Sequence, residues 1–394
     1  MLFQTFDDKE NCHAIYAKNR LYLKKAPPNL TKTWDYSECL RDADVEYAKY
    51  YCGGKSLEEA CPPYYKNKWD ETASKIKAFH RAAIEAKLNL NDHCFYDLFP
   101  PHFLLKYGEI KNRICSHVFK EHEKPLDYEF RVGLTKVLTE IKNKKLNVDV
   151  SVLKEQRHEF KVRQFLKKMK GTPPYIIYDM YGTKTGRLTA KQFPILTMDK
   201  SFRKILTPTN KWFLELDYNA AELRVMLALL NKEQPQEDIH KWNLKNVYGD
   251  MGTREKAKKR IFAWLYNSKS KDHLSNREYN REELLKKYWD ETYVKTYFGR
   301  KIEADKHHAL NYIIQSTAAD LFLRQMIKVW ELLKNKQSYI TFCLHDSLVI
   351  DLAQEDEDML LDIKEAFINT ELGMFKANLH GGQNFGEMKR MNIY

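Results

Sequence analysis

The pattern of apolar and polar residues divides the chain into three sections. Up to about residue 125, strand-like runs such as CHAIYAKNRLYL alternate with helical runs such as ETASKIKAFHRAAIEAKL, and paired prolines interrupt them. From about residue 126 to 170 the pattern is helical and rich in lysine, until GTPPY breaks it. The remaining residues combine strands with long helical insertions, which favours an α+β fold over a repeating βαβ fold.

The strongest strand prediction is an apolar run that ends in a carboxylate. Trp212–Leu216 predicts a strand, and Asp217 follows it directly. A helix is expected from Ala220, with Asn219 as its N-cap, and a second carboxylate, Glu222, lies in its first turn. Charged groups at the edge of apolar elements are costly unless they are paired, hydrated or bound to a metal. Asp217 is therefore a candidate metal ligand, and a second capping residue is the alternative.

A predicted β-hairpin carries another aspartate. Tyr339–Leu344 and Leu348–Leu352 are apolar runs on either side of the sequence HDS, which predicts two strands joined by a turn at Asp346. We expect this hairpin to lie beside the first strand, so that Asp217 and Asp346 meet at one end of a sheet. Two aspartates held together repel each other unless a divalent ion lies between them, and Mg²⁺ prefers such oxygen ligands.

A predicted helix in GTREKAKKRIFAWLYN collects cations and aromatic rings on one face. Thr253 is a candidate N-cap for this helix. Intervals of four residues place the following side chains on one face over roughly 18 Å: Arg254, Lys258, Phe262 and Tyr266. A triphosphate could lie on the two cations while its sugar and base pack on the rings. A solvated basic turn that leads into a buried apolar turn is the alternative.

Composition adds a basic charge and narrows the class of protein. With 66 Lys and Arg against 54 Asp and Glu, the net charge is +12 and the pI is about 9.0, which suits a polyanionic partner such as nucleic acid. The seven cysteines form no C-x-x-C pair, so neither a zinc site nor a disulfide framework is expected. No apolar run has the length of a membrane span, and the N-terminus lacks a signal-peptide pattern. We therefore expect a soluble protein in a reducing compartment.

The stretches described above resemble the family A DNA polymerases, the DNA polymerase I family. DYNAAELR resembles motif A of that family, R-x-x-x-K-x-x-x-F-x-x-x-Y resembles motif B, and LHDS resembles motif C. TKTGRLTA at 183–190, EDIH at 237–240 and LNYIIQSTAADLF at 310–322 match further family segments in the same order. The resemblance begins at about Leu126. It implies an α+β right-hand polymerase fold of palm, fingers and thumb with an antiparallel palm sheet, preceded by a small α/β exonuclease-like remnant.

The resemblance also implies a division of the chain into segments. The stretch between Glu129 and TGRLT is shorter than the thumb-bearing segment of the family, so we expect a reduced thumb and low processivity, or reliance on a partner. The predicted segments are 1–125 (degenerate exonuclease-like domain), 126–182 (reduced thumb and palm entry), 183–232 (palm with motif A), 233–308 (fingers with motif B) and 309–394 (palm with motif C).

Individual residues receive roles from the same resemblance. Asp217 and Asp346 would hold two Mg²⁺ ions, for which Mn²⁺ can substitute, with help from the backbone carbonyl of Tyr218. Lys258 would donate a proton to the departing pyrophosphate. Glu222 would be the steric gate that closes off space for a ribose 2′-hydroxyl. The incoming nucleotide would contact Arg254, Lys258, His240, Phe262 and Tyr266, and the primer and template would contact Arg187, Asn311, Gln315 and His345.

The implied activity is template-directed DNA synthesis, in which deoxynucleoside triphosphates are added to a primer 3′ end. Expected partners are primer–template DNA, deoxynucleoside triphosphates and either a processivity factor or a replicative helicase, with no membrane and a monomeric protein. The small size suggests a virus or mobile element, and therefore the cytoplasm of a bacterial or virus-infected cell, with an organelle left open. Ser347 stands where the family has a glutamate, so we expect weaker metal affinity or slower chemistry.

The N-terminal segment is expected to lack active proofreading. Exonuclease chemistry needs a cluster of carboxylates that holds two ions. Asp8, Lys9 and Glu10 fit the first exonuclease element of the family only crudely. Lys111 stands four residues after Tyr107, where an aspartate would be expected. A structural platform is therefore the preferred interpretation of this segment.

Two other functions stay open at this point. A single-subunit RNA polymerase shares the two aspartates and the cations of motif B, but Glu222 argues against it because those enzymes leave room for the ribose hydroxyl. A non-catalytic DNA-binding relative needs none of Asp217, Lys258 and Asp346, so their joint presence argues for activity. A reverse transcriptase is disfavoured because the sequence has no Y-x-D-D turn.

Overall fold

Two units of secondary structure, Met1–Thr139 and Glu140–Tyr394, make up the chain, and the boundary falls inside helix α4 (Tyr128–Asn143). Both units mix helices with mainly antiparallel sheets, which confirms the α+β prediction at this level. No helix in the described part of the chain is both long and apolar enough to cross a membrane. The structure, a computed structural model, describes residues 1–9, 12–23, 25–88, 93–267 and 269–391.

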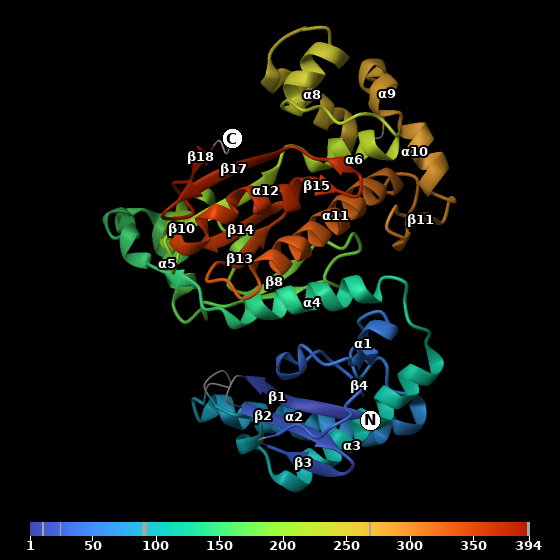
Figure 1. The fold of residues 1–394 in the computed structure, drawn as a ribbon, viewed down its shortest axis with the longest axis vertical. Helices are drawn as coiled ribbons and strands as arrows, with labels where there is room; N and C mark the ends of the chain where they lie inside the picture. The colour runs from blue at the N-terminus through green and yellow to red at the C-terminus, as the bar shows by residue number, and fades with distance from the viewer. Residues whose placement is uncertain (10–11, 24, 89–92, 268, 392–394) are drawn as a thin grey trace. The chain divides into compact units, whose positions relative to one another are not determined.

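A three-stranded antiparallel sheet and two long helices form the frame of the first unit (Figure 1). Strands β2 (Cys12–Ala17) and β3 (Arg20–Tyr22) lie in the run that predicted strands, and helix α2 (Lys66–Glu85) covers the predicted helical run. Helix α3 (Pro101–Glu121) begins with a proline, whose missing N–H costs nothing at that position. The other elements of this unit are β1 (Phe3–Lys9), β4 (Lys32–Thr33), β5 (Glu46–Tyr47) and α1 (Ala48–Tyr51).

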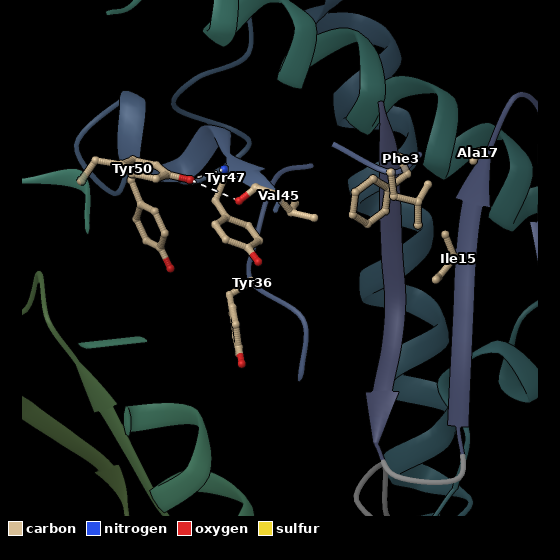
Figure 2. Packing of buried hydrophobic residues seen from close by; sticks show 9 residues of the cluster. Phe3, Ile15, Ala17, Tyr36, Val45, Tyr47 and Tyr50 are labelled. Atoms are coloured by element: carbon tan, nitrogen blue, oxygen red, sulfur yellow. Dashed lines mark hydrogen bonds between the residues drawn. The ribbon is translucent and has the colours of Figure 1, made fainter. Parts of the chain in front are cut away.

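Buried tyrosines fill much of the core of the first unit, as Figure 2 shows for Tyr36, Tyr47 and Tyr50. The ring of Tyr50 meets the rings of Tyr47 and Tyr128 edge to face, each at 5.9 Å between centroids. Such aromatic pairs each add about 0.5–1.5 kcal/mol beyond the burial of their area. The Tyr128 hydroxyl also accepts a hydrogen bond from the backbone N–H of Tyr47 at 2.9 Å. These tyrosines therefore serve packing.

One disulfide departs from the expectation that the cysteines form no disulfide framework. Cys12, at the start of β2, is bonded to Cys94, and 82 positions separate them in the sequence. A single pair with so wide a separation leaves no recognisable spacing, which is why the sequence pattern did not indicate it. The other described cysteines are Cys39, Cys52, Cys61, Cys115 and Cys343.

The sheet of the second unit has five antiparallel strands (Figure 1). The predicted hairpin pairs directly with the strand that carries Asp217, which confirms their expected placement. Along that strand, Glu215 and Asp217 share one face, because side chains alternate between the two faces. Tyr218 lies on the opposite face, where its ring stacks on Phe367 of helix α12 (Leu360–Ile368) at 4.3 Å. The strand order is β13 (Tyr339–Leu344), β14 (Ser347–Leu352), β10 (Trp212–Tyr218), β17 (Ala377–Gly382) and β18 (Lys389–Met391).

Two helices of the second unit begin with different caps. Helix α8 (Arg254–Tyr266) begins after Thr253, whose hydroxyl accepts a backbone N–H of the first turn at 3.3 Å, as predicted. Helix α6 (Ala221–Leu229) begins after Ala220, which has a φ of 57°, so the prediction of Asn219 as its N-cap is wrong. The Asn219 side chain instead accepts a backbone N–H of helix α7 at 2.8 Å. A tertiary contact has replaced the local cap.

The remaining elements surround this sheet or extend from it. The lysine-rich section predicted as helical contains α4 and α5, which are separated by a short strand. The elements are β6 (Asn147–Val148), α5 (Phe160–Met169), β7 (Ile176–Asp179), β8 (Thr189–Gln192), β9 (Leu206–Thr207), α7 (Ile239–Trp242), α9 (His273–Tyr279), α10 (Arg281–Tyr288), β11 (Tyr293–Lys295), β12 (Lys301–Glu303), α11 (Ala309–Leu333), β15 (Asn369–Thr370) and β16 (Gly373–Met374).

Candidate active site

Strand register brings the two predicted aspartates together at one end of the sheet. Asp217 on β10 lies directly opposite Ser347, the first residue of β14. Asp346 immediately precedes Ser347 in the turn of the hairpin, and His345 completes the turn with a φ of 58°. Histidine is among the residues that adopt this left-handed conformation more readily than most. The predicted meeting of Asp217 and Asp346 is therefore present in the fold.

Burial makes both carboxylates difficult to ionise. Burial, together with the nearby charges of Asp346 and Glu215, raises the pKa of Asp217 to about 7. Burial also raises the pKa of Asp346, and the nearby charge of Glu222 acts in the same direction. Acidic groups that are buried side by side in this way are stabilised by a bound cation. Oxygen ligands of this kind fit Mg²⁺, so the donor set suits a divalent ion.

A pocket of about 360 Å³ opens beside Asp346. Its walls come from the TGR segment, helices α6, α8 and α11, and the turn of the hairpin. The predicted site residues that line it are Arg187, Glu222, Phe262, Tyr266, His345 and Asp346. Segments that are distant in the sequence thus converge on one cavity next to the aspartate pair.

Glu222 is held firmly at the wall of this pocket. The Arg187 guanidinium donates to one carboxylate oxygen of Glu222 at 2.6 Å, and the Tyr266 hydroxyl donates to the other oxygen at 2.5 Å. The Glu222 side chain is only 13% exposed. The Tyr266 ring stacks on Phe262, with 5.9 Å between centroids and 8° between planes. Both oxygens of the acid are therefore fixed, and its position in the pocket is well defined.

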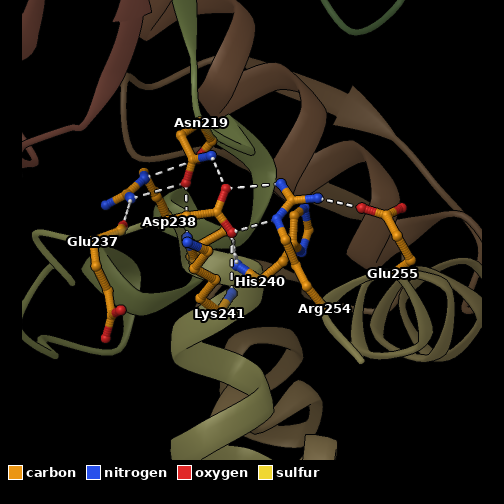
Figure 3. A network of polar contacts seen from close by, with 9 residues as sticks. Asn219, Glu237, Asp238, His240, Lys241, Arg254 and Glu255 are labelled. Carbon is orange, nitrogen blue, oxygen red and sulfur yellow. Dashed lines mark hydrogen bonds and ion pairs between the residues drawn. The ribbon is translucent and has the colours of Figure 1, made fainter. Parts of the chain in front are cut away.

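Helix α8 presents its cations next to a second polar network (Figure 3). Arg254 forms a bidentate pair with Asp238, with Nε–Oδ1 at 3.0 Å and Nη2–Oδ2 at 2.8 Å. Asp238 also caps helix α7 by accepting the backbone N–H of His240 at 3.1 Å. The His240 ring lies against Phe262, and burial lowers its pKa to about 4, so it is neutral at pH 7. Lys258 is exposed one turn after Arg254.

The structure places three further predicted residues outside the pocket beside Asp346. The Tyr218 hydroxyl donates to the backbone carbonyl of Phe367 at 2.6 Å, so this side chain points away from the aspartate pair. Asn311 and Gln315 lie one turn apart on α11, and the Gln315 amide donates to Asn311 at 3.3 Å. Asn311 lines a separate pocket of about 520 Å³, which it shares with Tyr266.

Sequence reasoning missed three polar residues near Asp217. Glu215 lies two residues earlier on the same face of β10. Asn378 and His380 on β17 stand directly opposite Asp217 and Glu215, respectively. The alternation in the sequence ELD was a usable signal for Glu215. The sequence ANLHGG has no apolar run, so no strand was predicted for Asn378 and His380.

The chain is similar in sequence and fold to known DNA polymerases. A sequence model described as DNA polymerase family A matches residues 277–387. The DNA polymerase I of Chloroflexus aurantiacus is 24% identical over 270 residues, which is 54% of this chain and 29% of that protein. Over these regions the chain is similar to DNA polymerase family A. The DNA polymerases I of Caldicellulosiruptor bescii and Thermus aquaticus are 27% identical over 237 residues and 26% identical over 233 residues.

The sequence matches span only a small part of each relative. The last two comparisons cover 46% and 45% of this chain, but only 28% of each relative. Among solved structures, the POL domain of Pol1 from M. smegmatis, in complex with DNA primer-template and dNTP, has a similar fold with a TM-score of 0.59. That likeness covers 73% of this chain and 76% of the other at 12% identity. It extends the relationship in fold beyond the region that the sequence model matches.

Proposed function

We propose that the second unit is a template-directed DNA polymerase that adds deoxynucleoside triphosphates to a primer 3′ end. The observation that carries this proposal is the convergence of Asp217 and Asp346 at the end of the sheet, beside a pocket lined by residues of α6 and α8. The two aspartates would hold two divalent ions, Mg²⁺ or Mn²⁺. Such ions stabilise the attacking and leaving oxygens of an in-line phosphoryl displacement.

The remaining chemistry falls to the side chains of helix α8. In the reaction, the primer 3′-hydroxyl oxygen forms a bond to the α-phosphorus, its proton leaves to solvent, and the bond to pyrophosphate breaks. Arg254 and Lys258 provide positive charge for the triphosphate along the face of α8. Lys258 is the proton donor for the departing pyrophosphate. The pair between Arg254 and Asp238 positions the guanidinium before the nucleotide arrives.

Glu222 favours a DNA polymerase over an RNA polymerase. Its carboxylate is fixed by Arg187 and Tyr266 at the wall of the pocket beside Asp346. A fixed side chain there takes up the space that a ribose 2′-hydroxyl needs, and it cannot move aside without breaking two hydrogen bonds. We therefore assign it as the steric gate. DNA binding without catalysis is the less favoured alternative because it gives no reason for two half-buried aspartates that repel each other.

The domain roles follow from this proposal. We assign residues 183–232 and 309–394 to the palm, 233–308 to the fingers, 126–182 to the reduced thumb and 1–125 to an exonuclease-like remnant. Primer–template DNA is the polymer substrate, in keeping with the contents of the Pol1 complex. A small thumb fits a need for a processivity factor or a helicase as partner.

The first unit is proposed to be inactive in proofreading. The Lys111 ammonium is buried against the rings of Phe6 and Tyr107, at 5.8 Å and 5.4 Å from their centroids. A buried cation at this position disfavours binding of a metal ion. In the described part of this unit, the close group of ligating atoms is Asp7 with Cys12 and Cys94, whose sulfurs are bonded to each other. The side chains of Asp8, Lys9 and Glu10 lie outside the described residues.

Primer extension on a defined template tests the proposed function. With Mg²⁺, we expect the purified protein to extend a labelled primer with deoxynucleotides and much more slowly with ribonucleotides. A parallel reaction without nucleotides should leave the primer 3′ end intact. Equal use of ribonucleotides would indicate the RNA polymerase alternative, and shortening of the primer would contradict the absence of proofreading. Tight DNA binding without extension would indicate the non-catalytic alternative.

A further inference from the structure

Ser347 at the hairpin is hydrogen-bonded to a carboxylate from the neighbouring strand. The Ser347 hydroxyl donates to Oε1 of Glu215 at 2.8 Å. Ser347 is the residue directly opposite Asp217. The resemblance to family A implies a glutamate at this position. Glu215 precedes Asp217 by two residues and shares its face of β10. An acid is therefore present beside Ser347, although a different strand carries it.

Glu215 is also held from its other side. His380 lies opposite it on β17, and the His380 Nδ1 atom is 3.3 Å from Oε2 of Glu215. The Glu215 side chain is only 16% exposed. Polar side chains therefore hold both carboxylate oxygens of Glu215, on the strand face that also carries Asp217.

A purely structural ion pair between Glu215 and His380 is the competing explanation. Replacing such a buried pair by apolar residues is often neutral or stabilising, so folding alone gives little reason to place it beside two half-buried aspartates. Glu215 places a further carboxylate on the same strand face as Asp217, where its negative charge would favour a cation bound at Asp217.

We propose that Glu215 is a relocated supporting carboxylate, which strengthens the divalent-metal site from strand β10 where Ser347 cannot do so from the hairpin. This inference rests on the proposed polymerase function. Glu215 is a positioning residue: it would support the site that Asp217 and Asp346 form, and it would not bridge both ions itself. In the described residues, its carboxylate does not lie within 4.8 Å of both aspartates, since no such three-acid group occurs there. His380 and Ser347 each orient one of its oxygens.

Exchange of the two residues between strands tests this inference. The variants are Glu215→Gln, Ser347→Glu and the double variant Glu215→Ser with Ser347→Glu, which moves the acid to the hairpin. Free Mn²⁺ would be titrated by electron paramagnetic resonance against each protein bound to primer–template DNA. Removal of a supporting group of this kind lowers metal affinity about 10- to 100-fold. We expect that loss for Glu215→Gln, and we expect the double variant to return to within about threefold of the original affinity.

Glu357→Gln is the matched control. Glu357 accepts a hydrogen bond from the indole of Trp212 at 3.0 Å, at the opposite end of β10. Its replacement therefore removes one carboxylate that contacts the same strand, far from Asp217. It should leave Mn²⁺ affinity unchanged. Thermal melting of every variant separates loss of fold from loss of metal.

Several outcomes would overturn the inference. Unchanged Mn²⁺ affinity in Glu215→Gln contradicts it, and so does a double variant that stays as weak as Glu215→Gln while melting normally. Because Mn²⁺ binding is measured without nucleotide incorporation, this result stands apart from the polymerase proposal. Absence of primer extension by the unmodified protein contradicts the proposed function, whereas the Mn²⁺ titration alone decides the role of Glu215.

Discussion

Asp217, Asp346 and Glu222 are three acids that the fold places at costly positions. Asp217 and Asp346 are half-buried beside each other, and Glu222 is fixed by two hydrogen bonds with little exposure. Folding alone favours hydrophobic or well-paired groups at such positions. Local rules are most often broken where function requires it, and these three residues follow that expectation.

The role of Glu222 leads to a prediction about sugar selection. Glu222→Ala removes the side chain that occupies the pocket wall, so incorporation of ribonucleotides relative to deoxynucleotides should rise by roughly 10- to 200-fold. Glu222→Gln has nearly the same volume and is the matched control, which should keep most of the selectivity. Competition between the two nucleotide types in primer extension measures both. If Glu222→Ala and the unmodified protein selected deoxynucleotides over ribonucleotides equally well, Glu222 would not be the steric gate.

Lys111 leads to a prediction about stability and pH. Burial lowers its pKa from 10.5 to about 8 in the folded chain. Between those values the unfolded chain holds a proton that the folded chain has lost, so the contribution of this group to stability rises with pH. At pH 7 the buried lysine is charged and costly, and Lys111→Met should raise the free energy of unfolding by about 2 kcal/mol.

The gain from Lys111→Met should shrink as pH rises from 8 toward 10.5, because the native lysine becomes neutral. Urea unfolding of both proteins at pH 7 and pH 10 measures the difference. Lys77→Met, at an exposed lysine of α2, is the control and should show no such pH dependence. If Lys111→Met raised the free energy of unfolding equally at both pH values, the claim that burial of the Lys111 charge destabilises the fold would be wrong.

At the scale of elements, helix α5 provides a basic surface in the proposed thumb. Lys167 and Lys168 are exposed near its C-terminal end. If both contact phosphates of duplex DNA, replacing them by glutamine should reduce the slope of log affinity against log salt concentration by about 1.8. Fluorescence anisotropy at several salt concentrations measures that slope. Glutamine at Lys75 and Lys77 of α2 removes the same charge from the first unit and should leave the slope unchanged.

Element prediction succeeded where apolar runs were continuous and ended in polar residues. β10 and the hairpin β13–β14 have that pattern, so the meeting of Asp217 and Asp346 could be predicted from the sequence. β17 has little apolar content and two glycines, so the sequence pattern did not predict this strand. The contact of Glu215 with His380 depends on strand register, which a sequence pattern with a missing strand does not supply. Asn219 failed as an N-cap because a tertiary contact outweighed the local preference.

At the scale of the whole molecule, the chain joins a small first unit to a larger second unit, and most of it has a fold similar to the POL domain of Pol1 from M. smegmatis. Its net charge of +12 fits binding to a polyanion such as DNA. The chain spans less than a third of the length of the curated relatives that it matches. The order of motifs along the chain predicted the similarity to DNA polymerase family A, whereas the Cys12–Cys94 disulfide left no sequence signal.

The central claim is that Asp217 and Asp346 form the catalytic metal site. Asp346→Asn keeps the size of the side chain and removes its charge. Single-nucleotide incorporation under single-turnover conditions, with primer–template affinity measured on the same protein, tests it most directly. We predict that incorporation falls by at least about 10²- to 10³-fold, with affinity for primer–template within about threefold. Unchanged incorporation, or parallel loss of incorporation and DNA binding in a protein that melts early, would contradict the claim.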